Sequence, residues 1–327
     1  MPSEFELITR HFKRPAVSAL LGVGDDCALL RPRAQMALAV SKDLLIEGRH
    51  FLAGTDAVRL GHKSLAVNLS DLAAMGADPR WVMLGLALPA ADEDWVAGFA
   101  RGFFALAARH GVELVGGDTT RGPLTLSVTI LGEVPPALAL RRDGARAGDD
   151  IWLSGATGEA ALGLAHLQGR TRVAQPLLQA CLDRLEVPEP RVTLGGRLRG
   201  LARSAIDVSD GLLADLGHIL ESSGVCAEID LPLLPLMPSL AQCNDAQLVR
   251  DCLLAGGDDY ELVFTADPQH RDELVDLGTE LGLALTRIGQ VLPGGAVTTG
   301  ATSAGVLVRD AAGSVVPISR SGFDHFG

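Results

Sequence analysis

Aspartates beside glycine or serine recur along this chain and carry most of its candidate chemistry. The segments are Gly24-Asp25-Asp26, Ser41-Lys42-Asp43, Gly116-Gly117-Asp118, Asp207-Val208-Ser209-Asp210-Gly211 and Gly256-Gly257-Asp258-Asp259. Any one of them is explained by turn chemistry, because Gly and Asp dominate turns and Asp or Ser caps helices. As a set they indicate more. Asp43, Asp118 and Asp207 each follow an apolar run, so we predict them at strand ends, where α/β proteins place ligand groups.

Asp71 differs from these because it lies inside a predicted helix. Ser64, Asn68 and Asp71 form one polar stripe on an otherwise apolar helix, and Asp is a poor residue for a helix interior. Clustered carboxylates repel one another unless a cation lies among them. Oxygen ligands without His or Cys favour Mg²⁺ over zinc or copper. Several Mg²⁺ ions among aspartates in turn indicate a polyphosphate ligand.

Three further features each leave two interpretations open. Gly155 and Gly158 follow a predicted strand and either seat a phosphate at a helix N-terminus or form an ordinary tight turn. Arg142 either contacts a phosphate or is a solvated residue of a basic linker. His50 either contacts a substrate or lies at the surface. The P-loop and protein-kinase signatures are missing from the sequence.

The elements that position these residues alternate between strands and helices, which predicts an α/β or α+β protein. Strands are predicted over 36–40, 81–88, 112–115, 124–134, 151–153, 205–208, 225–231, 260–265 and 285–291. Helices are predicted over 56–75, from Asp92 or Asp94 to near Gly111, after Gly158, and over 211–222 and 268–282. The strand over 81–88 is apolar almost throughout, so we expect it to be covered on both faces. Pro135-Pro136 and a short basic stretch predict a boundary that separates domains 1–137 and 138–327.

Composition narrows the class of protein. The chain has 327 residues and a formal net charge of −12, which argues against a nucleic-acid partner. Apolar runs are too short for a bilayer span, and the acidic N-terminus does not resemble a signal peptide. Phe5, Ile8 and Phe12 instead predict an amphipathic first helix. Five scattered cysteines indicate reduced thiols in the cytoplasm.

Six stretches together resemble the thiamine-monophosphate kinase family, of the superfamily that includes aminoimidazole ribonucleotide synthetase. They are GVGDDCALL, KSLAVNLSDLAAMGADP, GGDTTRGPL, AIDVSDGLLADLGHIL, GGDDYELVFT and GFDHF, and they extend from residue 22 to residue 326. The resemblance implies direct transfer of the ATP γ-phosphoryl group to thiamine monophosphate. It also implies a homodimer in which the N-terminal sheets pair into a barrel, with an α/β C-terminal domain.

The resemblance assigns a role to each matching residue. It implies Mg²⁺ ligands at Asp26, Ser41, Asp43, Asp71, Asp118, Asp207 and Asp210, with Asp207 and Asp210 also in the catalytic role. It places ATP at Gly117, Asp118, Arg142 and Ser209, and thiamine monophosphate at His50, Asp258 and Phe323. No covalent nucleophile is required, because phosphoryl transfer depends mainly on alignment and charge neutralisation.

Three positions depart from the family pattern. Lys42 stands where Thr is usual, between two implied metal ligands. Either one metal is lost, or it is held through the backbone carbonyl or by Ser41 and Asp43 alone, or the Lys42 ammonium replaces part of its charge. Asp258 replaces Glu, and Phe323 replaces Tyr. Two alternatives remain open. One is another ATP-using enzyme of the superfamily, against which the stretches NLSDLAAMGADP and GGDTTRGPL argue. The other is a Mg-nucleotide-binding regulator without turnover, for which Lys42 and Asp258 are the only sequence reasons.

Overall fold

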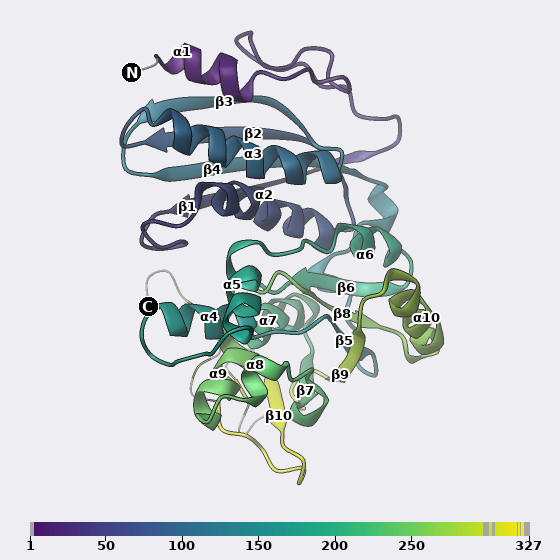
Figure 1. The fold of residues 1–327 in the computed structure, drawn as a ribbon. Coiled ribbons are helices and arrows are strands. Elements are labelled where there is room, and N and C mark those ends of the chain that lie inside the picture. The colour runs from purple at the N-terminus through teal and green to yellow at the C-terminus, as the bar shows by residue number, and fades with distance from the viewer. Residues whose placement is uncertain (1–2, 297–300, 303–304, 319, 321, 324–327) are drawn as a thin grey trace. The chain divides into compact units, whose positions relative to one another are not determined.

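The protein, described here from a computed structural model, divides into two compact units. The N-terminal unit comprises Met1–Leu72 and Ala77–Ala137, and the C-terminal unit comprises Ala73–Gly76 and Leu138–Gly327. The structure describes residues 3–296, 301–302, 305–318, 320 and 322–323. Residues 324–326 of the last family motif therefore lie outside the described residues. Each unit is built around one β-sheet with its own helices (Figure 1).

The N-terminal unit has a four-stranded sheet in the order β1-β4-β2-β3. Its strands are β1 (Ala37–Ile46), β2 (Asp78–Leu88), β3 (Glu113–Arg121) and β4 (Thr125–Val134). Strands β2 and β3 are parallel, and β4 is antiparallel to both β1 and β2. Helices α2 (Ala57–Ala74) and α3 (Glu93–Arg109) cover one face of this sheet (Figure 1). All four predicted strands and both predicted helices are therefore present.

Helices α2 and α3 approach each other closely because glycines stand at their contact. A Cβ atom added at Gly61 would lie 2.1 Å from the carbonyl oxygen of Phe99, and one added at Gly102 would lie 1.9 Å from that of Val58. The Asp92 side chain caps α3 by accepting a hydrogen bond from the N–H of Trp95. The predicted core face of α3 is confirmed, since all four of its apolar residues are buried: Val96, Phe99, Phe103 and Leu106.

The opposite face of this sheet is open in the single chain. Along β1, alternate residues are exposed, among them Val40 at 60% and Leu44 at 47%. Met83 on β2 is 41% exposed, so the expectation that this strand is covered on both faces is wrong. The helices cover only one side, and the long apolar run of β2 supplies both the core and an apolar open face.

The N-terminal segment is helical, as predicted, but it buries different residues. Helix α1 (Glu4–Leu7) continues into a π-helical turn over Ile8–Phe12. Leu7 and Phe12 are buried, whereas Phe5 is 76% exposed. The π-turn places buried residues five positions apart rather than at the α-helical spacing, so Phe5 does not reach the core.

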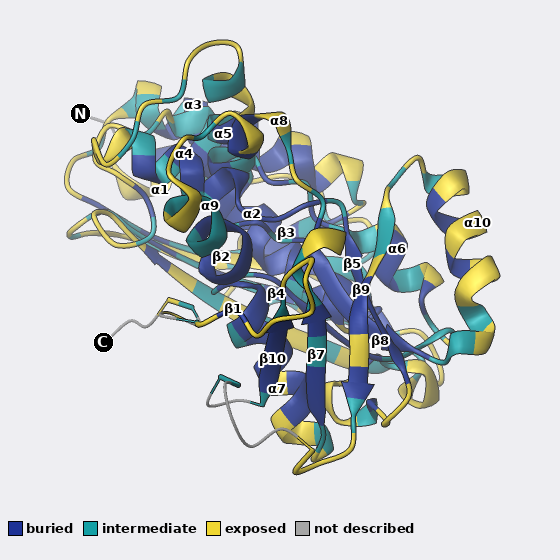
Figure 2. Ribbon diagram, turned by 90° about the horizontal axis from the view of Figure 1, so that it is seen from below, coloured by how far each residue is buried: buried dark blue, intermediate teal, exposed yellow. Residues whose placement is uncertain are grey.

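The C-terminal unit has a six-stranded mixed sheet in the order β10-β7-β9-β5-β8-β6. Its strands are β5 (Asp150–Ser154), β6 (Ala202–Asp207), β7 (Cys226–Asp230), β8 (Leu262–Ala266), β9 (Leu285–Leu292) and β10 (Val306–Arg309). Its helices are α4 (Glu159–Leu167), α5 (Leu177–Glu186), α6 (Val192–Arg197), α7 (Leu212–Ser223), α8 (Pro238–Ala241), α9 (Ala246–Ala255) and α10 (Arg271–Leu281). Strands β7 and β10 are largely buried, whereas α10 carries much exposed surface (Figure 2). Within the described residues, no helix combines the length and apolarity needed to cross a membrane.

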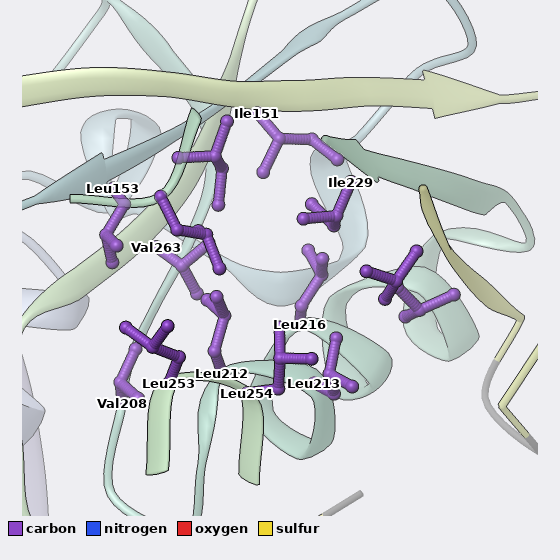
Figure 3. Close-up of a cluster of buried hydrophobic side chains, with 14 of the residues drawn as sticks. Ile151, Leu153, Val208, Leu212, Leu213, Leu216, Ile229, Leu253, Leu254 and Val263 are labelled. Carbon is purple, nitrogen blue, oxygen red and sulfur yellow. The ribbon is translucent and has the colours of Figure 1, made fainter. Parts of the chain in front are cut away.

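The main core of this unit joins the sheet to α7 and α9 (Figure 3). Ile151 and Val263 project from the sheet into the same cluster as Leu212 of α7 and Leu253 of α9. Val208, which follows β6, belongs to this cluster as well. The ends of two loops, one before α7 and one after α9, are therefore anchored in the same apolar core.

Candidate active site

Ser41 and Asp71 come together in the N-terminal unit, as the resemblance implies. Ser41 lies on β1, and its hydroxyl donates a hydrogen bond to Oδ2 of Asp71 on α2. Strand β1 continues through Ser41, Lys42 and Asp43, and Asp43 pairs with Val128 of β4. The prediction that Asp43 ends its strand is therefore wrong. The polar residues continue the alternation of the strand instead of interrupting it, because Ser41, Asp43 and buried Leu45 share one face.

The same alternation places Lys42 on the other face of β1. Lys42 is exposed and pairs with Thr129 of β4, whereas Ser41 and Asp43 are half-buried on the side of α2. A side chain on the opposite face cannot take a place between those two residues. The hypothesis that the Lys42 ammonium replaces a metal charge beside Ser41 and Asp43 is therefore contradicted within this unit.

Asp118 also lies within a strand and not at its end. Strand β3 continues through Gly116, Gly117 and Asp118, and Asp118 pairs with Gly85. This register places Asp118, which is exposed, on the open face of the sheet. Gly117 has a φ of +152°, and a Cβ atom there would lie 1.9 Å from the carbonyl oxygen of Leu84. A glycine is therefore required where the two parallel strands approach.

Asp26 and His50 lie in loops of the same unit. Asp26 is exposed, and its N–H donates a hydrogen bond to Oδ1 of Asp25 at 2.9 Å. The N–H of Ile46 donates to Nδ1 of His50 at 2.9 Å. Because Nδ1 accepts this bond, the neutral imidazole carries its proton on Nε2, which makes Nε2 a hydrogen-bond donor.

In the C-terminal unit, residues 208–211 connect β6 to α7. Asp207 is the last residue of β6, which confirms its predicted place at a strand end. The Asp215 carboxylate, one turn into α7, accepts hydrogen bonds from the N–H groups of Ser209, Asp210 and Gly211 at 3.0, 3.0 and 3.1 Å. Asp215 was not singled out from the sequence. Its position, four residues after Gly211 and in the first turn of a predicted helix, is a signal that could have indicated this role. Its carboxylate fixes the backbone of the segment.

Two predicted substrate residues lie against this segment. The N–H of Asp258 donates to the carbonyl of Ser209 at 2.9 Å, and the N–H of Phe323 donates to the carbonyl of Asp210 at 2.9 Å. Tyr260 adds a bond to the carbonyl of Val208 at 2.9 Å. The structure thus brings together Ser209, Asp210, Asp258 and Phe323, which together span more than a hundred residues of the sequence.

Buried carboxylates surround this group. Burial, followed by the nearby charges of Asp207 and Asp210, raises the pKa of Asp215 to about 8, while the backbone N–H donors oppose the shift. Burial likewise raises the pKa of Asp259, together with the charges of Glu261 and Asp258. Of the causes of these shifts, the negative charges of Asp207 and Asp210 are the ones that would also attract cations.

Gly155 and Gly158 each lie against a buried carboxylate of the protein itself. The N–H of Gly158, at the start of α4, donates to both oxygens of Asp259 at 3.0 and 2.9 Å. A Cβ atom at Gly155 would lie 2.1 Å from Oε1 of the buried Glu261. The N–H that a phosphate would use is therefore already engaged, which favours the structural interpretation of this pair.

Arg142 lies away from Ser209 within the same unit. Its carbonyl accepts from the hydroxyl of Ser223 at the end of α7 at 2.8 Å, whereas Ser209 lies before the start of that helix. Twelve residues of helix span about 18 Å. The structure therefore does not join Arg142 to the Ser209 group, and the guanidinium is exposed.

The donor atoms fit magnesium chemistry. Within the N-terminal unit, Ser41 and Asp71 offer a hydroxyl and a carboxylate oxygen at hydrogen-bond distance. Within the C-terminal unit, Asp207 and Asp210 offer carboxylates of their own. Oxygen donors of this kind suit Mg²⁺. Across the described part of the chain, no three His, Cys, Asp or Glu side chains are close enough to form a metal cluster by themselves. An ion held by either set of residues would complete its coordination with water or with oxygens of a bound ligand.

Two family models match the chain. The AIR synthase related protein N-terminal domain matches residues 24–134, and the corresponding C-terminal domain matches residues 146–300. The fold and the acidic site thus place the chain in a class of two-domain α/β proteins. Thiamine-monophosphate kinase from Escherichia coli (strain K12) is 45% identical over 99% of this chain and 98% of its own. The chain therefore belongs to the thiamine-monophosphate kinase family within the AIR synthase related proteins.

Solved structures agree with this assignment. The crystal structure of thiamine-monophosphate kinase from Stenotrophomonas maltophilia K279a is 49% identical with a TM-score of 0.83, covering 95% of both chains. AaThiL complexed with AMPPCP and TMP is 29% identical with a TM-score of 0.77, covering 98% of this chain and 96% of that one.

Proposed function

We propose that this protein phosphorylates thiamine monophosphate with ATP, forming thiamine diphosphate by direct transfer of the γ-phosphoryl group. The observation that carries the proposal is the hydrogen bond between Asp258 N–H and Ser209 carbonyl. It joins a residue assigned to the acceptor to one assigned to the nucleotide. The similarity to AaThiL, which was solved with AMPPCP and TMP, supports the same pair of ligands here.

The chain's own residues contribute alignment and charge. Ser209 contacts the polyphosphate end of the nucleotide, and Asp210 would hold Mg²⁺ beside it, on a backbone that Asp215 holds in place. Asp258 and Phe323 orient the acceptor beside them, with the Phe323 ring, which is 38% exposed, against an apolar ring of the substrate. His50 donates from Nε2 to the acceptor, and Gly117 and Asp118 add contacts to the nucleotide. Arg142 has no role in this proposal, because its carbonyl bonds Ser223 at the far end of α7 from Ser209. Alignment of two anionic phosphates in line supplies much of the rate enhancement.

Magnesium belongs to this proposal as the cofactor. Asp26, Ser41, Asp43, Asp71, Asp118, Asp207 and Asp210 would hold it, through oxygen donors only. When bound, Mg²⁺ neutralises the charge on phosphate oxygens. Without such cations, the aspartates would repel the phosphates of both substrates. We therefore expect activity to require a divalent cation.

The proposal includes a homodimer in the cytoplasm. The open face of the N-terminal sheet exposes five large apolar side chains: Leu38, Val40, Leu44, Ile46 and Met83. An apolar sheet face of this kind is stabilised by a second copy, because contiguous exposed apolar surface is unusual on monomers. The five cysteines are all free, which suits a reducing compartment. By this proposal residues 1–137 form the metal-binding, ATP-binding and dimerisation domain, and residues 138–327 form the α/β domain.

The decisive experiment is formation of thiamine diphosphate from the monophosphate, ATP and Mg²⁺, followed by chromatography. We expect product in proportion to ADP. The variant Asp258→Asn should raise the KM of the acceptor more than that of ATP, since Asp258 is assigned to the acceptor. ATP binding without product would contradict the proposal and favour a nucleotide-binding regulator.

A further inference from the structure

The loop over residues 256–260, between α9 and β8, combines a strained backbone with a buried carboxylate. Asp258 and Tyr260 have φ values of +69° and +50°, in the left-handed region that non-glycine residues rarely adopt. Between them, Asp259 is only 4% exposed. A conformation of this kind persists only where surrounding contacts enforce it. The contacts of Asp259 therefore need an explanation.

The carboxylate of Asp259 ties the loop to the N-terminus of α4. Both of its oxygens accept from the N–H of Gly158, which has a φ of +98°. A Cβ atom at Gly158 would lie 3.0 Å from the carbonyl of Cys252, so α4 begins directly against the backbone of α9. A carboxylate at a helix N-terminus is favoured by the helix dipole and by the unpaired N–H groups.

The neighbours of Asp259 point to the proposed site. With its side chain held inward, the backbone on either side is fixed: Asp258 N–H bonds the carbonyl of Ser209, and Tyr260 N–H bonds that of Val208. The Tyr260 hydroxyl donates to Oδ1 of Asp258 at 3.2 Å. The direction of the Asp258 side chain thus depends on a backbone that Asp259 anchors.

Burying an acid at position 259 is unfavourable, because other acidic side chains lie close to it. Glu261 and Asp258 both lie near enough to disfavour its negative charge. Glu261 already accepts from Ser154, Arg184 and Arg191, so its charge is compensated separately. An apolar residue would avoid the cost of burying a further acid but would leave the Gly158 N–H without its acceptor.

We propose that Asp259 is a positioning residue that holds Asp258 in the acceptor site by anchoring the loop to α4. This inference rests on the proposed function for its kinetic part. It assigns Asp259 no contact with either substrate. Asp259 affects the reaction only by fixing the position of Asp258.

The kinetic test is a double-mutant cycle in the full-length enzyme. We expect Asp259→Asn, which keeps one acceptor oxygen, to raise the acceptor KM roughly tenfold and leave the ATP KM within about twofold. Asp259→Ala should raise it further. Added to Asp258→Asn, the Asp259→Asn change should have little additional effect, because the two act in series. Independent, multiplying effects, or an equal rise in the KM of ATP, would overturn the inference.

The matched control is Asp149→Asn. Asp149 is a buried aspartate of the same unit, 1% exposed, that accepts from the N–H of Arg146 at 2.8 Å and pairs with Arg203 at 3.2 Å. This variant should lower thermal stability and leave the KM of the acceptor unchanged. An acceptor KM raised as much as in Asp259→Asn would show that general destabilisation explains the effect and would overturn the positioning role.

Hydrogen exchange tests the anchoring without turnover. The amides of Asp258 and Tyr260 should lose protection in Asp259→Asn and keep it in Asp149→Asn. Unchanged protection would overturn the inference even if the kinase assay succeeds. If the wild type forms no thiamine diphosphate, the proposed function fails, and the exchange experiment still decides whether Asp259 holds the loop.

Discussion

Val40 offers the sharpest test of the proposed dimer. It lies at the centre of the open face of β1 and is 60% exposed in the single chain. Replacing Val40 with alanine removes two methyl groups, whose full burial contributes about 1.6 kcal/mol at 0.8 kcal/mol per carbon. Scaled by its exposure of 60%, the loss is about 1 kcal/mol per copy. A two-fold interface contains the residue twice, so the dimer loses about 2 kcal/mol.

This loss corresponds to a roughly 30-fold rise in the dissociation constant. Val40→Asp should have a larger effect, because each copy would also bury an unpaired carboxylate at a cost of several kcal/mol. We expect more than a thousandfold weakening for that variant. Sedimentation equilibrium across a dilution series measures both changes. Because Val40 is exposed in the single chain, thermal unfolding of the separated chain should change little.

Val275→Asp is the matched control. Val275 is 54% exposed on α10 of the C-terminal unit, outside the proposed interface. The Val275→Asp variant should leave the dissociation constant of the dimer unchanged. A wild-type protein that sediments as a monomer, or a Val40→Asp variant that dimerises as tightly as the wild type, would refute the argument from the open sheet face.

Four further predictions concern Lys42, Asp215 and the cysteines. Lys42→Thr should leave the Mg²⁺ dependence of activity unchanged, since Lys42 lies on the face opposite Ser41; a shifted Mg²⁺ titration would contradict this placement. Asp215→Ala should lower the free energy of unfolding by about 3 kcal/mol, because each of the three N–H donors left unpaired costs about 1 kcal/mol. Urea titration measures this change. A loss below about 1 kcal/mol, which is typical of a single helix cap, would contradict the prediction. Thiol labelling at pH 8 should modify exposed Cys27 and spare Cys252, because burial raises the pKa of Cys252 to about 12. Since the unfolded thiol ionises near 9, this residue should also favour unfolding as the pH rises from about 9 to 12, which alkaline denaturation of Cys252→Ala would measure.

The open face matters because it separates residues that the sequence groups together. Asp118 lies on that face by register, whereas Ser41 and Asp43 lie on the side of the helices. Strand alternation, which the sequence carries, tells which residues of one strand share a face. Only the pairing between strands shows that Asp118 and Ser41 lie on opposite faces of the sheet.

The sequence by itself determined the α/β class, the order of strands and helices in the N-terminal unit, and the residue types that fit a magnesium-dependent phosphoryl transfer. In the C-terminal unit it did not predict strand β10 or helices α5, α6, α8 and α9. Those conclusions rest on local periodicity and on motifs, which need no knowledge of distant contacts. The α3 core face and the position of Asp207 at the end of β6 were accessible for the same reason.

Only the tertiary structure decided how those residues are arranged. Strands β1 and β3 extend through their polar segments because β4 and β2 supply hydrogen-bonding partners far away in the sequence. The same holds for Asp259, whose carboxylate accepts from the backbone N–H of Gly158, 101 residues away in the sequence. A buried polar group must find a partner somewhere in the fold, and which partner it finds depends on contacts that no local pattern encodes.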